Sequence, residues 1–355
     1  MRKSQNIAWI DILKAMGIIL VIIGHNDTIL TKYIYSFHMA LFFFLSGITF
    51  NDDKWKDPYK FIKSRCKSLL IPYFTYSIFL YIIWIPLDLI KGEIITNDIL
   101  IKNFLGIFYS QGAHEYMAWG IPMWFLTCLF LVSILYYFIN KYFKEKSFQI
   151  LILCGVIGYL TQYLPYRLPW SLDTAFTAVV FYGIGHIYKD KIRRHKPIKK
   201  TILVLFFLGF IVIAFTKING RVDFYSNKFN NYILFYICSM AGIMISLILS
   251  KRINNMIKFN LILKFLKFIG KNTIPILAFH IRVLEIIKFI SINIFKMNLN
   301  FNSFLLGAII LPILQILILI PIIIIINKLK VIKIKNIKIK NIEIKDKQIN
   351  EYHSQ

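Results

Sequence analysis

The sequence predicts an all-α protein, a polytopic helical bundle that crosses a membrane about ten times. Of its 355 residues 57% are hydrophobic, whereas soluble domains are about 45–50% apolar. Apolar runs recur along almost the whole chain, and about 20 such residues cross a bilayer as a helix. The start, MRKSQN followed at once by a helix with two charges, differs from a cleaved signal peptide, so we expect that helix to be retained.

The distribution of Lys and Arg between the predicted spans indicates that both termini are cytoplasmic. The predicted spans are 7–24, 33–50, 69–90, 122–140, 148–165, 174–188, 201–216, 231–250, 274–295 and 303–326. With the N-terminus inside, the cytoplasmic segments before the tail contain 24 Lys and Arg, and the outer segments contain 8. We therefore expect a membrane domain over residues 1–326. Residues 327–355 form a basic, low-complexity cytosolic tail that lies on the lipid headgroups.

The composition excludes several classes of function. The net charge of +26 is explained by the cytoplasmic loops, and no soluble basic domain is visible, so no nucleic-acid partner is expected. The four cysteines lack the spacing of a metal site, and we interpret them as unpaired. His114 and Glu115 are adjacent, but no third ligand follows at metal spacing, so no metal is expected.

The first span carries an unusual set of polar residues, Asp11, Lys14 and His25. A central Asp or Lys costs about 2.5–3.5 kcal/mol on the insertion scale, which roughly cancels the gain from the span's Ile, Leu and Val residues. At 100° per residue, Lys14 and His25 lie within about 20° of each other, with Asp11 about 60° away. Asp11 and Lys14 can pair, whereas His25 lies about 16 Å further along the axis. The stripe indicates a functional site, although Lys14 could instead snorkel to the surface with His25 as a polar helix end.

Two other segments are rich in charge. The loop after the second span carries Arg65 and Lys67 among six basic residues, which could hold a phosphate-bearing cytosolic ligand or simply mark the cytoplasmic side. The ninth span carries four ionisable residues, which indicates that it lines an internal cavity: His280, Arg282, Glu285 and Lys288. Arg282 and Glu285 are three residues apart, and we expect them to pair.

The outer surface and the later spans add fewer signals. Trp124 opens the fourth span and is either part of an aromatic belt or a platform for a sugar ring. Asp173 lies in a tight outer turn, and Gly183 and Gly185 predict close helix packing. The outer loop 217–230 is polar without a motif, and 257–272 reads as an amphipathic interfacial helix.

Several of these segments, taken in order, resemble acyltransferase family 3. The opening WIDILKAMGIILVIIGH, SFHMALFFFLSGITF and SRCKSLLIPYF is similar to the start of these bacterial integral-membrane O-acyltransferases, which include the fucose O-acetyltransferase-like group. Later segments resemble further landmarks of the family in the same order: PMWFL, LPWSLDTAFTAVVFYGIGHIY and IGKNTIPILAFH. The resemblance covers about residues 7–326.

The resemblance implies acetyl transfer from cytosolic acetyl-CoA to a sugar hydroxyl of an envelope glycan or its precursor, at a bacterial inner membrane. The family's key motif, a basic residue, ten residues and a His, falls on Lys14 and His25, and Lys14 replaces the usual Arg. The family's basic residue after the second span falls on Arg65, with Lys67 close by, and its tryptophan falls on Trp124.

These implications define an expected mechanism. The CoA phosphates bind Arg65, Lys67 and Lys14, and His25 acts with Lys14 and Asp11 as general base, or else carries the acetyl group itself. The remaining candidates are expected to bind or orient the acceptor: His38, Trp124, Asp173, His280 and Glu285. His38 is the expected neighbour of His25, whereas His280 and Glu285 are expected to lie deeper in the membrane. The alternatives are a transporter or exporter of a glycan or small solute, which would use the charged helices as a substrate path, and a non-catalytic membrane scaffold.

Overall fold

The computed structural model describes residues 8–194, 201–256, 260–297, 299–329 and 332, and the regular structure within these ranges is helical. The exception is an isolated antiparallel bridge between Asp223 and Lys228 in an outer loop. The predicted all-α class is confirmed. Residues 1–7 and most of the predicted tail, 330–331 and 333–355, lie outside the described residues.

Among the described residues, five helices are long and apolar enough to cross a membrane: Pro58–Ile90, Ile121–Tyr142, Thr201–Asn219, Tyr232–Asn255 and Phe304–Leu329. The other predicted spans fall on shorter helices, namely α1 (Ala8–Gly24), α3 (His38–Thr49), α9 (Ser147–Leu160), α10 (Leu172–Ile187) and α15 (Thr273–Phe289). The count of ten spans and the cytoplasmic position of both termini stay predictions.

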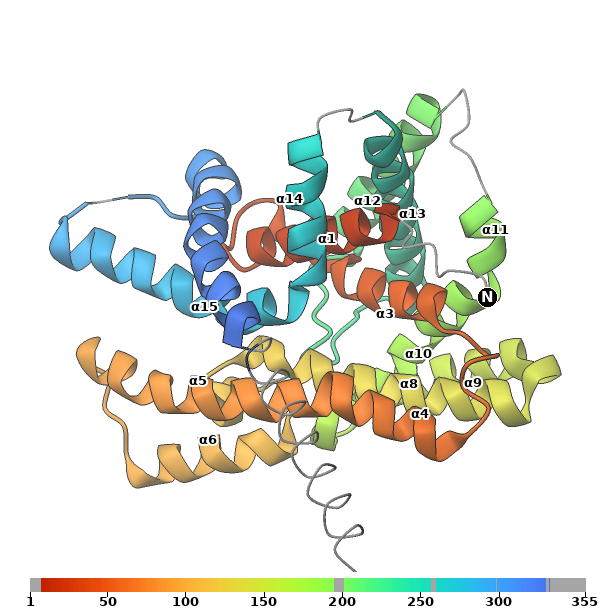
Figure 1. Ribbon diagram of the computed structural model, residues 1–355, viewed down its shortest axis with the longest axis horizontal. Coiled ribbons are helices and arrows are strands. Elements are labelled where there is room, and N and C mark those ends of the chain that lie inside the picture. Colours follow the sequence, from red (N-terminus) through yellow and green to blue (C-terminus); the bar gives the residue numbers. More distant parts are fainter. Residues whose placement is uncertain (1–7, 195–200, 257–259, 298, 330–331, 333–355) are drawn as a thin grey trace, which may run out of the picture.

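The long helices contain several labelled elements (Figure 1). The long helix Pro58–Ile90 is continuous and consists of α4 (Pro58–Arg65), a π-helical turn (Cys66–Leu70) and α5 (Ile71–Ile90). Three further long helices correspond to α8 (Trp124–Tyr142), α12 (Thr201–Asn219) and α13 (Tyr232–Met256). The shorter elements are α2 (Thr31–Tyr35), α6 (Asn97–Tyr109), α7 (His114–Met117), α11 (Lys189–Arg194) and α14 (Asn260–Lys271). Two more π-helical turns occupy Ile290–Ile294 and Phe304–Ile310.

The first helix lies in the middle of the molecule, as Figure 1 shows. It packs against α3, α13, α14 and α15, and its residues Ile12, Leu13 and Ala15 are fully buried. The contact with α14 is close, because a Cβ on Gly270 would lie 1.9 Å from the carbonyl oxygen of Asp11. The helix that carries the polar stripe is therefore enclosed by other helices.

The contact between α3 and α10 is made through glycines. A Cβ on Gly47 would lie 1.9 Å from the carbonyl oxygen of Tyr182, and one on Gly185 would lie 2.1 Å from that of Phe44. Each helix thus places its backbone against a glycine of the other, as small residues allow in membrane helices. The close packing predicted for Gly185 is confirmed.

The predicted outer loop 91–121 contains a helix that the sequence analysis did not anticipate, α6, which runs beside α5 (Figure 1). Thr96 caps its first turn with its side-chain oxygen. The Tyr73 hydroxyl donates to the carbonyl oxygen of Ile107 over 2.7 Å, and the Tyr81 hydroxyl donates to that of Leu100 over 3.1 Å. These bonds hold the segment against the long helix.

Candidate active site

A cavity of about 180 Å³ lies at the end of α1 where His25 is placed. Its polar and aromatic walls come from α1, α2, α3, the start of α8 and the loop between α12 and α13: His25, Tyr35, His38, Trp124, Arg221 and Tyr225. We call it the outer cavity, after the side of the membrane on which the sequence analysis predicts this end of α1 to lie. His25, His38 and Trp124, which the sequence analysis named separately, are brought together here.

Two histidines, His25 and His38, line this cavity, and a third, His280, lies against His25. The rings of His25 and His280 have centroids 5.0 Å apart, and the Tyr35 ring lies 6.1 Å from that of His25 and 4.9 Å from that of His38. The prediction that His280 lies deeper than His25 is wrong. Position along each helix does not give the relative depth of these residues, because the helices cross at different angles (Figure 1).

Contacts with backbone carbonyl groups determine which nitrogen carries the proton in two of these rings. His38 Nδ1 lies 2.8 Å from the carbonyl oxygen of Ile34, and His280 Nδ1 lies 2.9 Å from that of Leu277. A carbonyl oxygen only accepts, so in each neutral ring Nδ1 carries the proton and Nε2 is an acceptor. The Nε2 atom of His280 is buried and has no hydrogen-bond partner within the described part of the chain. Such an atom is available to a bound hydroxyl.

Arg221 is a wall residue that the sequence analysis missed. Its guanidinium lies 4.5 Å from the centroid of the Tyr35 ring, and it pairs with Asp223 over 3.3 Å and with Asp27 over 3.7 Å. Burial raises the pKa of the Asp223 carboxyl, and the Arg221 guanidinium opposes that shift. A single Arg in a polar loop gave no signal, because its place at the cavity depends on how the loop folds back.

Asp173 lies beneath this loop rather than in the cavity wall. It is 1% exposed, and both of its oxygens accept from Arg167, with Oδ1 3.1 Å from Nη2. Arg167 also donates to the Thr174 hydroxyl over 3.0 Å and to the carbonyl oxygen of Tyr225. The pair therefore connects α10 to the loop that supplies Arg221 and Tyr225, so Asp173 has the geometry of a positioning residue.

Replacing Asp173 with alanine is expected to destabilise the protein by about 3 kcal/mol, because Arg167 would keep a partly buried charge without its carboxylate. Thermal unfolding of the purified protein measures this. Asp98→Ala is the matched control, because the pair of Asp98 with Lys102 is exposed and is expected to contribute less than about 1 kcal/mol. Equal stability losses in the two variants would contradict the role assigned to Asp173.

Glu285 is separated from the outer cavity by its ion pairs. Its Oε2 lies 2.7 Å from Arg282 and 2.8 Å from Lys91, and Lys91 also pairs with Asp88 over 2.9 Å. The predicted pair of Arg282 and Glu285 is confirmed. These contacts join α15 to the end of α5, and Glu285 is not among the residues that line the cavity.

The face of α1 between Ile18 and His25 lines two neighbouring cavities. A narrow cavity of about 30 Å³ is lined by Ile18 and Val21 and shares Val21, Met39 and Leu277 with the outer cavity. Lys14, Ile18, Val21 and His25 follow one another at spacings of four, three and four residues, which places them on one face of the helix. The stripe predicted from the sequence thus faces the interior.

Asp11 and Lys14 do not form an ion pair with each other. It is 7% exposed, while Lys14 is half-buried, and the described residues include no ion pair between the two. The pair that the i, i+3 spacing allows is not formed, and α14 crosses α1 here, with Gly270 against the backbone of Asp11. Lys14 lies one helical turn before Ile18 on the same face of α1 and does not line the narrow cavity.

Arg65 and Lys67 lie at the opposite end of the bundle. The Arg65 guanidinium lies 5.2 Å from the centroid of the Phe61 ring, which stacks on Tyr137 with centroids 4.4 Å apart. The Nε atom of Arg65 is buried and finds no hydrogen-bond partner in the described ranges, while Lys67 is exposed. A π-helical turn follows Arg65 directly, a feature that often occurs at functional sites. An immobilised guanidinium with a free donor suits an anionic ligand.

The apolar helices and the enclosed polar cavity define a multi-pass membrane protein with an enzyme-like site. A family model described as an acyltransferase domain matches residues 7–327, and the chain therefore belongs to acyltransferase family 3. The protein is accordingly a membrane acyltransferase. Comparison with curated proteins and with solved structures finds no match.

Proposed function

We propose that the protein is an O-acetyltransferase that moves acetyl from cytosolic acetyl-CoA to a sugar hydroxyl of a cell-envelope or secreted polysaccharide or its precursor. The observation that carries this proposal is the face of α1 from Ile18 to His25, which lines the narrow cavity and then the outer cavity, with Lys14 one turn earlier on the same face. An acyl donor from one side and a glycan from the other would meet at His25. The protein then resides in the bacterial inner membrane with both termini in the cytoplasm.

The donor is proposed to enter at the basic end. The CoA phosphates bind Arg65 and Lys67, since a guanidinium binds phosphate oxygens bidentately. Lys14 lies about 16 Å from His25 along the helix axis and serves as a further cation on the path. The narrow cavity marks the proposed path of the uncharged pantetheine arm towards His25, and at about 30 Å³ it has to widen when the arm enters.

The chemistry at His25 is proposed to be general-base catalysis. His25 removes the proton from the sugar hydroxyl as the oxygen attacks the thioester carbonyl carbon. The carbon–sulfur bond then breaks, the sulfur leaves as a thiolate, and the proton passes to it, giving free CoA and the acetyl ester. The unpartnered Nε2 of His280 accepts a hydrogen bond from a second hydroxyl and orients the sugar. In a two-step variant His25 carries the acetyl group itself.

The acceptor is proposed to bind on the outer side of the cavity. Trp124 is 4% exposed and forms part of the wall, where an aromatic face packs against the C–H side of a sugar. Arg221, Tyr225 and His38 supply polar atoms that fix the orientation of the sugar.

Replacing Arg65 with alanine is expected to weaken CoA binding about 10- to 100-fold, because the phosphate loses a charge-assisted, bidentate partner. The measurement is a titration of labelled CoA against the purified protein at constant ionic strength. Lys60→Ala is the control, because Lys60 is an exposed cation of the same helix.

The control separates a specific site from general attraction. We expect Lys60→Ala to change the affinity less than about two-fold, as for an isolated surface charge. If both variants weakened binding equally, Arg65 would contribute only net charge. If the wild type showed no saturable CoA binding, the transport alternative would replace the proposal.

A further inference from the structure

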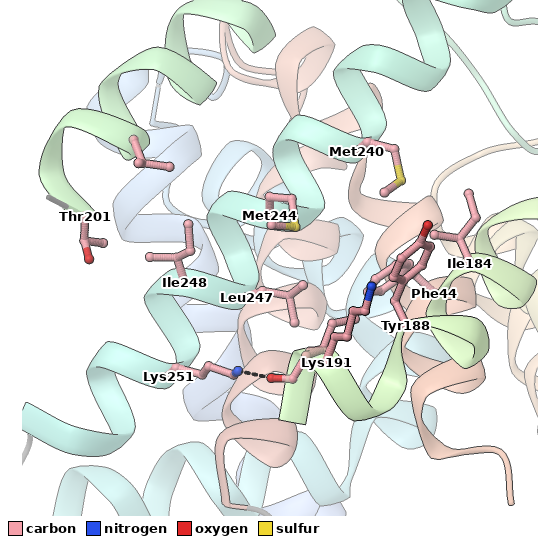
Figure 2. A pocket seen from close by; sticks show the side chains of 12 residues that line it. Phe44, Ile184, Tyr188, Lys191, Thr201, Met240, Met244, Leu247, Ile248 and Lys251 are labelled. Atoms are coloured by element: carbon pink, nitrogen blue, oxygen red, sulfur yellow. Dashed lines mark hydrogen bonds between the residues drawn. The ribbon is translucent and has the colours of Figure 1, made fainter. Parts of the chain in front are cut away.

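A second cavity, of about 340 Å³, lies on the other side of α3 from the outer cavity. It is bounded by α3, α10, α11, α12 and α13. Figure 2 shows that α13 supplies one wall through four apolar side chains: Met240, Met244, Leu247 and Ile248. Packing explains the gap, because α12 packs against α13 whereas α10 packs against α3, α8 and α9.

The cavity has the length of one membrane leaflet. Its wall on α13 runs from Met240 to Lys251, which is about 16 Å at 1.5 Å per residue. The hydrocarbon core of a bilayer is about 30 Å thick, so one leaflet contributes about half of that. An acyl chain of a single leaflet therefore matches the apolar part of the cavity.

Two lysines line the cavity, Lys191 on α11 and Lys251 near the end of α13. Lys251 donates to the carbonyl oxygen of Ile192, which holds its ammonium group at the cavity edge (Figure 2). Lys191 is exposed, its Nζ lies 5.6 Å from the centroid of the Tyr188 ring, and no ion pair to it occurs within the described ranges. By the positive-inside rule the end of the cavity at these lysines is the cytoplasmic end, where lipid headgroups lie.

Two other lateral grooves show that the charge is particular to this cavity. The groove between α9, α10 and α13 is lined by Tyr and Asn beside aliphatic residues, and the groove between α1, α14 and the last helix is lined by aliphatic residues, Pro and Phe. Among the residues that the structure describes, no Lys or Arg lines either groove. Basic pockets between helices on the cytoplasmic side bind anionic headgroups.

We propose that this cavity binds an anionic phospholipid of the inner leaflet, with one acyl chain between α10 and α13 and the headgroup at Lys191 and Lys251. The lipid is a structural ligand of the acyltransferase and takes no part in the transfer. It fills the space that the helices leave and joins α10 to α12, which have no extensive contact of their own.

The test is electron paramagnetic resonance of spin-labelled lipids with the purified full chain in phosphatidylcholine vesicles. Labelled phosphatidylglycerol is expected to show a larger immobilised fraction than labelled phosphatidylcholine. Met244→Trp fills the cavity. In this variant the preference for phosphatidylglycerol over phosphatidylcholine is expected to fall to the value of the non-specific lipid layer around the protein. Phe206→Trp is the control on the exposed face of α12 and is expected to retain the preference.

A second variant keeps the test valid if Met244→Trp does not fold. Lys191 is exposed, so Lys191→Gln is expected to fold normally and to lower the preference for phosphatidylglycerol about five-fold. Lys102→Gln, an exposed cation of α6, is expected to have no effect. Equal immobilisation of both lipids by the wild type, or unchanged preference in Lys191→Gln, would overturn the proposal.

Discussion

Replacing His25 with alanine is expected to lower the rate of acetyl transfer about 10²- to 10⁴-fold, the usual contribution of a positioned general base. The variant should still bind acetyl-CoA, because the proposed phosphate contacts lie at the other end of the bundle. The measurement uses membranes that contain wild type or variant, acetyl-labelled CoA and a crude glycan extract, with label counted separately in the protein and glycan fractions.

The distribution of label also separates the two mechanisms. Label in the glycan fraction of the wild type alone supports direct transfer through His25, and label retained on the wild-type protein supports an acetylated His25. His114→Ala is the control, because His114 is exposed in α7 and does not line the outer cavity. Equal transfer by wild type and His25→Ala would refute the role of His25.

Replacing Gly185 with alanine is expected to abolish most of the folded protein. The added methyl group would lie 2.1 Å from the carbonyl oxygen of Phe44, a backbone atom that cannot rotate away. Overpacking against movable side chains costs about 1–3 kcal/mol, and separating two helices along their backbones costs more. The measurement is the yield of monodisperse protein after detergent extraction, followed by thermal unfolding.

The matched control is Gly209→Ala in α12. A Cβ at Gly209 would meet no atom within 4 Å, and alanine favours a helix over glycine by about 1 kcal/mol. We therefore expect opposite changes in thermal stability from the same substitution at two helical glycines. Normal yield and stability of Gly185→Ala would contradict the close α3–α10 contact.

Much of the fold follows from local patterns that the sequence displays directly. Apolar runs located the helices, and a helical period of 3.6 residues placed Lys14 and His25 on one face. The i, i+3 spacing correctly predicted the pair of Arg282 and Glu285, because both partners lie on one helix. Signals of this kind depend on neighbours within one or two turns.

The rest depends on how distant elements cross. His280 is 255 positions after His25 in the chain. No periodic pattern in the sequence predicts that α15 crosses α1 next to His25. Arg221 reaches the cavity because the loop after α12 folds back and is held by Arg167. Asp11 lies where α14 crosses α1, and the pair with Lys14 that the spacing allows is not formed. Each of these results is set by tertiary packing, which local sequence patterns do not encode.

The link from Arg167 to Tyr225 has a consequence for how an acceptor is selected. The loop that closes the outer cavity is already tied to α10 by charged hydrogen bonds, so little conformational entropy is lost when a ligand binds. A preorganised wall of this kind gains affinity without an ordering step, but it does not reshape itself around a poorly fitting ligand. We therefore expect the protein to discriminate between acceptors by steric exclusion at the mouth of the cavity. Substitutions of Arg167 or Asp173 are expected to relax this specificity as readily as substitutions of the wall residues themselves.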